Sequence, residues 1–504
     1  MSAAFRLALA ENVHDSCVTL ARHGEVLVHL EFERLTRRKH HRLTTLDEFM
    51  NVLALLNERH AISGDLEVIV VRHKVERLLG DAVDVIRSMW PAASVVDIEH
   101  LDAHAGYAFA SGFDDALVVA LDGGGDRRVS DPEPNGRLYH LRDNALTFVG
   151  PLFPNAAIGI DGRAWTLVAM GMFDDRYAAG KVMGLGAHGV VRPLWWDKLT
   201  SPGFDPVAWC YDAEGALSRL RYLGLTSPSH DADLAATLQG LFTERIRDAI
   251  APYRFMSRNL VLVGGCALNV CTNTDVASSL GFVGAYVPPC PGDEGVSLGA
   301  LLYRCGDEGT PLRLPGTPYL GLGNVVSREP DVKRVAELLV RGGAVAWHIG
   351  RPEAGPRALG HRSLFALPTV ENKRRLSEVI KGREPFRPVA PIVCDVKAPD
   401  WFDYEYASPH MSFVGHSRDR TAKEAPGVVH VDGTARMQTI TEEIDGVVYS
   451  LLEHVESQTG CPILINTSLN QAGRPICGTY ADSISLFREC DVDALVLDDI
   501  LLMK

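Results

Sequence analysis

The sequence has 504 residues, of which 46% are hydrophobic and 23% are charged, an average composition that excludes disordered, collagenous and coiled-coil proteins. Its 50 Lys and Arg residues against 64 Asp and Glu residues give a net charge of −14, which argues against a surface built to bind nucleic acid. The length predicts two or three domains.

No apolar run reaches the roughly 20 residues that a membrane-spanning helix needs, and the N-terminus lacks the basic start of a signal peptide. The 10 cysteines are scattered without a Cys-x-x-Cys pair, which favours reduced thiols over a disulfide framework or a zinc knuckle. We therefore expect a soluble, cytoplasmic protein without membrane contacts.

The first 120 residues alternate short apolar runs with longer amphipathic segments. Residues 5–10, 17–21, 26–30 and 66–71 are predicted strands, and residues 45–59 and 75–90 have the apolar spacing of helices. Two more predicted strands, 116–121 and 259–263, each run into a glycine turn. This alternation predicts an α/β fold.

Residues 100–110 are predicted to form a helix that starts with His100-Leu101-Asp102-Ala103-His104. Side chains four residues apart share one helix face, so His100 and His104 could bind one ion. Asp293, in a glycine-rich turn, is a candidate third ligand. Two histidines and one carboxylate form a known Fe(II) geometry, which zinc or manganese would also fit. The spacing alone leaves open that both histidines are ordinary surface residues.

Two glycine turns follow predicted strands, and glycine lets backbone N–H groups approach a phosphate. Each turn taken singly is as well explained by an ordinary chain reversal. Together with the paired histidines, they are candidates for a nucleotide site made by Gly123, Gly124, Gly125, Gly264, Gly265 and Asn269.

Residues 305–324 are rich in Gly and Pro, which suits a connection better than an element interior. We place the main domain boundary there, between domains 1–320 and 321–504. Beyond it we predict a helix at 330–341 and a strand at 343–348.

A basic cluster lies between Arg351 and Arg387, inside an otherwise acidic protein. It places Arg357, Lys381 and Arg387 beside Gly-Pro and Phe-Arg-Pro turns, which reduce the cost of ordering cations around an anion. We therefore favour a phosphate or carboxylate site over a solvated basic face.

Two later segments could serve the same anion: the turn that ends at Arg436, and the strand and turn at 462–470, with Asn466 and Ser468. For the second segment, an Asn or Ser cap is the alternative interpretation.

In this order, the motifs resemble those of the ATP-dependent O-carbamoyltransferases of nodulation and antibiotic tailoring. The match runs from His14-Asp15-Ser16 and Glu33-Arg34-Leu35-Thr36-Arg37-Arg38-Lys39-His40, through Gly180-Lys181-Val182-Met183-Gly184-Leu185, to Asn466-Thr467-Ser468. The resemblance implies an actin-like (ASKHA) N-terminal domain and a C-terminal α/β domain of the threonylcarbamoyl-adenylate-synthase type.

The resemblance also implies an activity. The C-terminal domain would make carbamoyl adenylate from carbamoyl phosphate and ATP with Mg. The N-terminal domain would transfer the carbamoyl group, at a separate site, to a hydroxyl of a small-molecule natural product in secondary metabolism, such as antibiotic biosynthesis.

Site residues follow from the same resemblance. His100, His104 and Asp293 match Fe(II) positions, and His14 matches a position near the transfer site, where it would orient or deprotonate the acceptor. An ordinary strand-end histidine remains the alternative for His14. Carbamoyl phosphate and ATP would be bound by Lys381, Arg387 and Arg436, which are also the catalytic cations, and by Ser468, Arg357 and Asn466.

Two alternatives stay open. A tRNA threonylcarbamoyl-transfer enzyme would need a nucleic acid surface, against which the net charge of −14 weighs. A non-catalytic actin-like nucleotide-binding regulator would leave the C-terminal cations unexplained. The acceptor, the native metal and the oligomeric state, a homodimer included, are not determined by the sequence.

Overall fold

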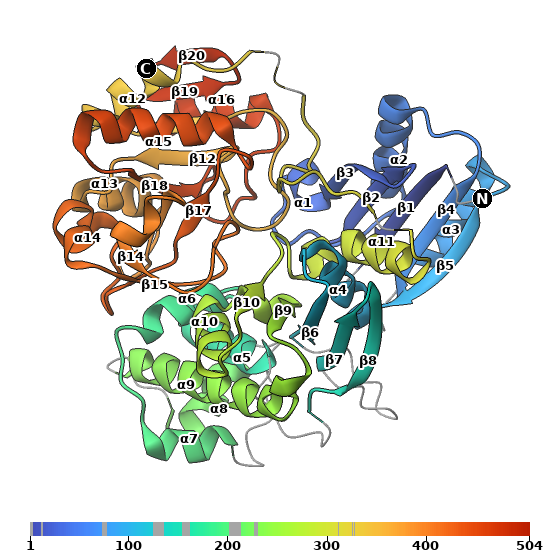
Figure 1. Cartoon of the computed structure of the whole chain (residues 1–504), viewed down its shortest axis with the longest axis horizontal. Helices are drawn as coiled ribbons and strands as arrows, with labels where there is room; N and C mark the ends of the chain where they lie inside the picture. Colours follow the sequence, from blue (N-terminus) through green and yellow to red (C-terminus); the bar gives the residue numbers. More distant parts are fainter. Residues whose placement is uncertain are drawn as a thin grey trace.

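The computed structural model describes residues 4–11, 14–72, 78–123, 136–153, 162–200, 213–225, 230–310, 312–324, 326 and 328–504. In these residues the strands form two five-stranded sheets, a seven-stranded sheet and a small three-stranded sheet. In Figure 1 the first sheet (blue), the second sheet (teal and green) and the C-terminal part (orange and red) form three lobes around a common centre.

The first sheet has the strand order β3-β2-β1-β4-β5. Its central strand β1 is antiparallel to β2 and parallel to β4. The strands are β1 Phe5–Ala10, β2 Cys17–Arg22, β3 Glu25–Glu31, β4 Leu66–Arg72 and β5 Ser94–Glu99. The helices of this lobe are α1 Phe32–Thr36, α2 Leu46–His60 and α3 Leu79–Met89.

The second sheet repeats this topology, with the order β10-β9-β6-β7-β8 and β6 in the place of β1. Its strands are β6 Asp115–Leu121, β7 Gly136–Arg142, β8 Ala145–Pro151, β9 Asn259–Val263 and β10 Gly284–Tyr286. Its helices are α5 Gly162–Phe173, α6 Ala179–Gly186, α7 Pro193–Thr200, α8 Ala213–Tyr222, α9 Asp231–Ile250 and α10 Val270–Ser279, with short 3-10 turns η2 Ala251–Met256 and η3 Gly265–Leu268. Two such sheets in one chain form the actin-like fold, which confirms the predicted N-terminal architecture.

Two helices lie between the N-terminal sheets and pack against both. They are α4 His100–Ala105, continued by the 3-10 turn η1 Gly106–Ala110, and α11 Val296–Asp307, preceded by η4 Asp293–Gly295. The helices cross closely: a Cβ on Gly299 would lie only 2.2 Å from the carbonyl oxygen of Ala103. Any residue other than glycine at this position would push the two helices apart. This close crossing brings the start of α4 beside the start of α11.

Strand alternation divides each N-terminal sheet into an inner and an outer face. In β1, Ala8 and Ala10 face the shared inner layer, whereas Leu7 and Leu9 pack in the outer layer with residues of α2, such as Leu53. The outer face of the second sheet is covered by residues of α5, α6 and α9. The small inner-face side chains of β1 leave room for the crossing helices, while larger residues such as Ile69 and Tyr139 fill the rest of this layer.

The C-terminal domain contains the seven-stranded sheet, with the order β17-β13-β18-β12-β11-β19-β20. Residues of α12 and α15 pack on one face and residues of α16 on the other. Its strands are β11 Val345–His348, β12 Arg362–Ala366, β13 Ala390–Cys394, β17 Gln438–Ile440, β18 Ile463–Ser468, β19 Ala494–Leu497 and β20 Ile500–Met503. The small sheet is made of β14 Phe402–Asp403, β15 Gly415–Ser417 and β16 Thr434–Ala435.

The helices of this domain are α12 Val332–Val340, α13 Val370–Arg374, α14 Asp419–Glu424, α15 Gly446–Thr459 and α16 Tyr480–Glu489, with a π-helical turn η5 Arg375–Ile380 and 3-10 turns η6 Ala398–Asp400 and η7 Pro426–Val428. The predicted boundary between domains 1–320 and 321–504 falls between α11 and α12; it stays a prediction.

The predicted strands are found within one or two residues of their expected ends, and β1, at residues 5–10, and β9, at residues 259–263, match fully. Two helix predictions need correction. The segment 100–110 is α-helical only to Ala105 and then tightens to a 3-10 turn, and helix α3 begins at Leu79 rather than at residue 75. Residues 73–77 lie outside the described part of the chain. None of the helices in the described residues is long and apolar enough to cross a bilayer.

Two histidines, the buried His29 and the half-buried His410, destabilise the folded chain in acid. Burial lowers the pKa of each from 6.5 to about 4. Between pH 6.5 and 4 the unfolded chain therefore binds more protons at these two positions than the folded chain. Each histidine lowers the free energy of unfolding by at most about 1.4 kcal/mol for each unit by which the pH is lowered. This contribution should lower the urea midpoint between pH 7 and pH 5, against the opposite contribution of Glu31 and Glu294, whose pKa values burial raises to about 7 and about 8.

His410→Gln tests this pH dependence, because glutamine does not titrate and can still donate to the carbonyl of Val287, which His410 Nδ1 contacts at 2.9 Å. The urea midpoint at pH 7 minus the urea midpoint at pH 5 should be smaller in the variant than in the wild type. Equal differences in both proteins would contradict the assignment.

Candidate functional site

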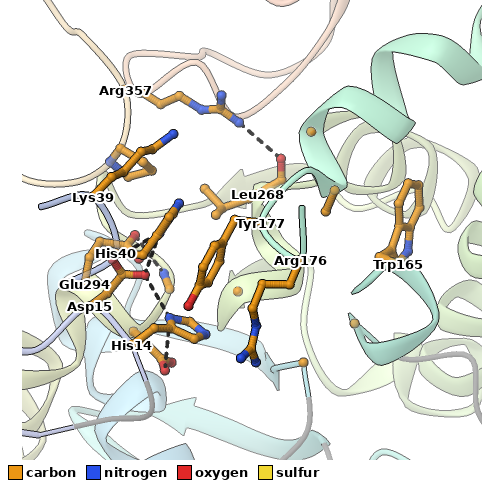
Figure 2. A pocket seen from close by; sticks show the side chains of 18 of the residues that line it. His14, Asp15, Lys39, His40, Trp165, Arg176, Tyr177, Leu268, Glu294 and Arg357 are labelled. Atoms are coloured by element: carbon orange, nitrogen blue, oxygen red, sulfur yellow. Dashed lines mark hydrogen bonds and ion pairs between the residues drawn. The ribbon is translucent and has the colours of Figure 1, made fainter. Parts of the chain in front are cut away.

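A cavity of about 400 Å³ lies between the N-terminal lobes and the C-terminal domain. Figure 2 shows part of its wall, where His14, Tyr177 and Arg357 approach from segments far apart in the sequence. Its lining includes His14, Asp122, Gly265 and Asp293 before the predicted domain boundary, and Arg357, Arg383, Arg387 and Ser468 after it. The volume suits a small-molecule ligand.

The repeated sheet topology explains why two connections meet at this cavity. In each sheet the central strand is followed by the connection to its antiparallel neighbour, which spans residues 11–16 after β1 and residues 122–135 after β6. His14 and Asp15 come from the first connection, and Asp122 and Gly123 from the second; all four line the cavity. The corresponding connections of the two repeats therefore line the same cavity.

The three predicted metal ligands converge at one end of the cavity. His100 Nε2 lies 3.3 Å and His104 Nε2 lies 3.6 Å from Asp293 Oδ1. A fourth side chain joins them, because Asp122 Oδ2 lies 3.1 Å from His100 Nε2. One ligand atom from each of the four residues falls within 4.8 Å of all the others. The convergence follows from the crossing of α4 and α11 at the end of β6.

The charges of this cluster suit a cation. Burial alone would lower the pKa of His100, but Asp293 and Asp122 raise it to about 10. The same contacts hold the pKa of Asp293 well below its usual range against the effect of burial. The raised pKa of His100 shows that the two carboxylates attract positive charge to this point, and a divalent ion would supply that charge in place of the proton.

His14 lies next to this cluster. Its Nδ1 is 2.8 Å from Asp15 Oδ2 and 3.9 Å from Asp293 Oδ2. Burial would lower the pKa of His14, but the hydrogen bond to Asp15 and the charge of Asp293 raise it to about 9. His40 also contacts Asp15 at 3.2 Å and stacks on Tyr177 with ring centroids 3.9 Å apart (Figure 2). Asp15 therefore fixes the orientation of the His14 ring and leaves Nε2 for a ligand.

The other end of the cavity is cationic. Arg357, Arg383 and Arg387 line it, and Arg436 lies close enough for their charges to lower its pKa well below the usual value, together with burial. Burial and the charge of Arg387 also lower the pKa of Arg357 to about 10 and that of Arg383 to about 9. Arg436 Nε is buried without a hydrogen-bond partner in the described residues. Such mutual repulsion is relieved when an anion binds.

Lys381, which follows the π-helical turn η5, is buried beneath this cation cluster. Its Nζ donates to Ser468 Oγ at 2.7 Å and to Asn470 Oδ1 at 2.6 Å. Burial, Arg383 and Arg387 lower the pKa of Lys381 well below its usual range. Lys381 does not line the cavity but holds Ser468, at the end of β18, which does.

Asn466 is placed differently from its prediction. It is 1% exposed, it is not part of the cavity lining, and its Nδ2 donates to Ala358 O and to Gln438 Oε1. Asn466 and Ser468 lie on the same face of β18, but residues two apart in a strand are separated by about 7 Å. Asn466 therefore lies deeper below the cavity than Ser468. The structure thus gives Asn466 a packing role under the cavity.

The two glycine turns are only partly cavity wall. Gly123, Gly265 and Asn269 line the cavity, whereas Gly264 does not. Gly264 has φ +92°, and a Cβ there would lie 2.2 Å from Leu121 O, so its glycine is explained by strand packing. Asn269 Oδ1 accepts from Thr272 N at 3.1 Å and so caps α10. Gly124 and Gly125 lie outside the described residues.

Sequence reasoning missed several residues of the cavity. Asp122 lies in a predicted glycine turn and was not predicted as a site residue, although a carboxylate directly after a buried strand can indicate a binding site. Asp15, Lys39, Arg383 and Asn470 also line the cavity, and no local pattern shows that these distant segments meet there.

The resemblance implied separate sites for activation and transfer. Asp293 of the first candidate set and Arg357, Arg387 and Ser468 of the second line one cavity, whereas His100 and His104 are not part of its lining.

Comparison with known proteins gives matches over most of the chain. The family model for the carbamoyltransferase N-terminus matches residues 74–302, and that for the carbamoyltransferase C-terminus matches residues 336–504. The nodulation protein NolNO of Sinorhizobium fredii is 30% identical over 98% of this chain and 79% of its own length. The nodulation protein NolO of Bradyrhizobium diazoefficiens is 32% identical over 81% of this chain and 79% of its own length. Among solved structures, the ethanolamine utilization protein EutJ from Carboxydothermus hydrogenoformans matches with a TM-score of 0.31 and 12% identity, over 60% of this chain and 90% of its own.

Proposed function

Because this chain belongs to the carbamoyltransferase family, we propose that it activates carbamoyl phosphate with ATP and transfers the carbamoyl group to a hydroxyl of a small-molecule natural product. The observation that carries the proposal is the single cavity with a histidine and carboxylate cluster at one end and clustered arginines at the other. A phosphorylated donor and a metal-assisted transfer require these two chemistries side by side.

The cationic end is suited to activation. Water first cleaves carbamoyl phosphate to carbamate and phosphate, and a carbamate oxygen then attacks the α-phosphorus of ATP, from which pyrophosphate leaves. Arg357, Arg387 and Arg436 would bind the phosphate oxygens, since guanidinium groups form paired hydrogen bonds to them. Lys381 would hold Ser468 toward the same oxygens and neutralise charge as pyrophosphate leaves. Mg would accompany ATP as in other phosphoryl transfers.

The opposite end fits a divalent metal. His100, His104 and Asp293 would hold it, with Asp122 beside them, and these nitrogen and oxygen donors suit Fe(II), which we propose as the native ion. When bound, such an ion supplies positive charge that stabilises the phosphate of departing AMP. Asp293 and Asp122 keep the two imidazoles in the cluster, and the close helix crossing at Gly299 keeps the cluster rigid.

His14 would act on the acceptor. Asp15 holds its Nδ1 at 2.8 Å, so Nε2 would face a bound hydroxyl and orient it, or accept its proton, as it attacks the carbamoyl carbon. Aromatic and apolar residues that line the same cavity, Trp165, Tyr177 and Leu268 among them, would bury the acceptor's apolar surface (Figure 2). A role in the secondary metabolism of a natural product, such as antibiotic biosynthesis, rests on the resemblance, and the net charge of −14 argues against a nucleic acid acceptor.

The proposal predicts pyrophosphate release from ATP that depends on carbamoyl phosphate and needs no acceptor. Purified protein with ATP and Mg should release pyrophosphate only after carbamoyl phosphate is added, because the adenylate forms before an acceptor is used. A coupled pyrophosphate assay measures it, with carbamoyl phosphate omitted as the first control and phosphate in its place as the second.

The outcomes separate the candidate functions. Release that requires threonine and bicarbonate instead would identify the threonylcarbamoyl-transfer alternative. Absence of release with either donor, with and without a panel of alcohols, would refute the proposal and leave the nucleotide-binding regulator.

A further inference from the structure

Lys39 brings a cation of the N-terminal domain into the anion site of the C-terminal domain. It lines the same cavity as Arg357, Arg383 and Arg387, and in Figure 2 its side chain extends toward Arg357. The side chain is exposed and is part of the cavity lining. Within the described residues its ammonium group has no hydrogen bond and no ion pair, unlike the neighbouring Arg38, whose Nη1 lies 3.5 Å from Glu48 Oε1.

The electrostatics of Lys39 agree with this position. Burial between the cavity walls lowers its pKa, and the charges of Arg387 and Arg383 lower it further, against the opposing effect of Glu33. The charge of Lys39 in turn contributes to the lowered pKa of Lys381. Cations from both domains therefore repel one another across a small space, an arrangement that a polyanion stabilises.

Hydrogen bonds to the C-terminal domain hold the segment that carries Lys39. Arg37 Nη1 donates to Ile476 O at 2.6 Å, and Nη2 donates to Pro475 O at 3.0 Å. Arg34 Nη2 donates to Gly355 O at 2.6 Å, while Gly355 N donates to Glu31 Oε1 at 2.8 Å. Two arginines of the N-terminal domain thus bind main-chain carbonyls on both sides of the C-terminal anion site.

The backbone around Lys39 adopts an uncommon conformation. Arg37 has φ +61° and His40 has φ +55°, in the left-handed region where side chains other than glycine cost roughly 1–2 kcal/mol each. Hydrogen bonds offset this cost, since Arg37 N donates to Glu33 O at 3.0 Å and His40 N donates to Glu33 Oε2 at 2.8 Å. Such residues cluster at functional sites. The two turns direct Lys39 into the cavity while Arg38 stays at the surface.

We propose that Lys39 binds a phosphate group of the ligand held by the C-terminal arginines, so that the anion site is assembled from both domains. The chemical nature of this ligand, carbamoyl phosphate or a nucleotide with its pyrophosphate, rests on the proposed function; the binding of a phosphate anion does not. The site is then complete only when the two domains are docked, which ties activation in one domain to the presence of the other.

The test compares Lys39→Ala with Lys39→Arg, which keeps the charge, and with Arg38→Ala, a matched neighbour whose side chain is 68% exposed. The first measurement is calorimetric binding of inorganic pyrophosphate to the full chain, which needs no catalysis. A lost charge-assisted hydrogen bond weakens binding by about 10-fold or more. We expect that loss for Lys39→Ala, recovery to within a few-fold for Lys39→Arg, and no change for Arg38→Ala.

The second measurement is the KM for ATP and for carbamoyl phosphate in acceptor-independent pyrophosphate release, in which Lys39→Ala should raise at least one KM by a similar factor. Unchanged pyrophosphate binding by Lys39→Ala, or equal losses in Lys39→Ala and Arg38→Ala, would overturn the inference. If the wild type releases no pyrophosphate, the proposed function fails, but the calorimetric comparison still decides the role of Lys39.

Discussion

His104→Ala is expected to abolish carbamoyl transfer while leaving pyrophosphate release close to the wild-type rate. His104 is fully buried, and its Nε2 lies 3.6 Å from Asp293 and 3.2 Å from His100 Nε2. Its removal takes one imidazole from the proposed metal site, and loss of a Lewis acid worth several kcal/mol slows transfer by about 10³-fold or more. The activation residues lie at the other end of the cavity and keep their contacts.

Elemental analysis gives this prediction a readout that does not depend on activity. Bound iron per chain should fall in His104→Ala and in the larger variant His104→Gln, which fills more of the space. His140→Ala is the matched control, since His140 lies on β7, pairs with Asp115 at 2.9 Å and does not line the cavity. Equal metal content in wild type and in both His104 variants would refute the metal assignment.

Arg387→Ala is expected to reduce acceptor-independent pyrophosphate release by about 10²–10³-fold, the usual effect of removing one charged donor to a developing anion. Arg387 lines the cavity, and its only described ion pair is a long one, 3.8 Å to Glu384. Steady-state kinetics with ATP and carbamoyl phosphate measures the loss, which should appear in kcat as well as KM because the charge develops in the transition state.

The same variant should not lose stability. The charge of Arg387 lowers the pKa values of Arg357, Arg383 and Arg436, so removing it relieves repulsion between buried cations. We expect an unchanged or higher Tm, in keeping with sites that trade stability for function. Arg341→Ala, an exposed arginine at the end of α12, is the control and should keep full activity. A lower Tm in Arg387→Ala together with lost activity would indicate a structural role instead.

Local sequence patterns predicted the elements well where periodicity was strong. Strands such as β1 and β9 were placed to the residue, because burial on both faces of a sheet leaves a nearly continuous apolar run. The ends of helices were less certain, as at Leu79 and Ala105, because competition between α-helical and 3-10 turns depends on packing. The repeated topology of the two five-stranded sheets was not visible as a sequence repeat. Two sheets with the same topology need a similar order of strands and helices, but not identical residues.

Candidate site residues divide in the same way. Spacing put His100 and His104 on one helix face, and the structure brings them to Asp293. Asp122 completes the cluster only because β6 ends beside the crossing of two helices, which no local pattern encodes. Asn466, predicted at the anion site, is 1% exposed, and its depth could not be predicted because the sequence shows that a polar residue is near a strand end but not how deep it lies.

The sequence alone determined the α/β class, most of the strands, the order of the motifs and the chemical types of the candidate residues, because these depend on composition and on periodicity along the chain. Only the tertiary structure decided that the carboxylates of the histidine cluster line one cavity with the arginines, that Asp122 joins this cluster, and that Lys39 reaches the arginines from the other domain. Distances between segments hundreds of residues apart are set by helix crossings, sheet order and domain docking, and these emerge only when the whole core packs at once.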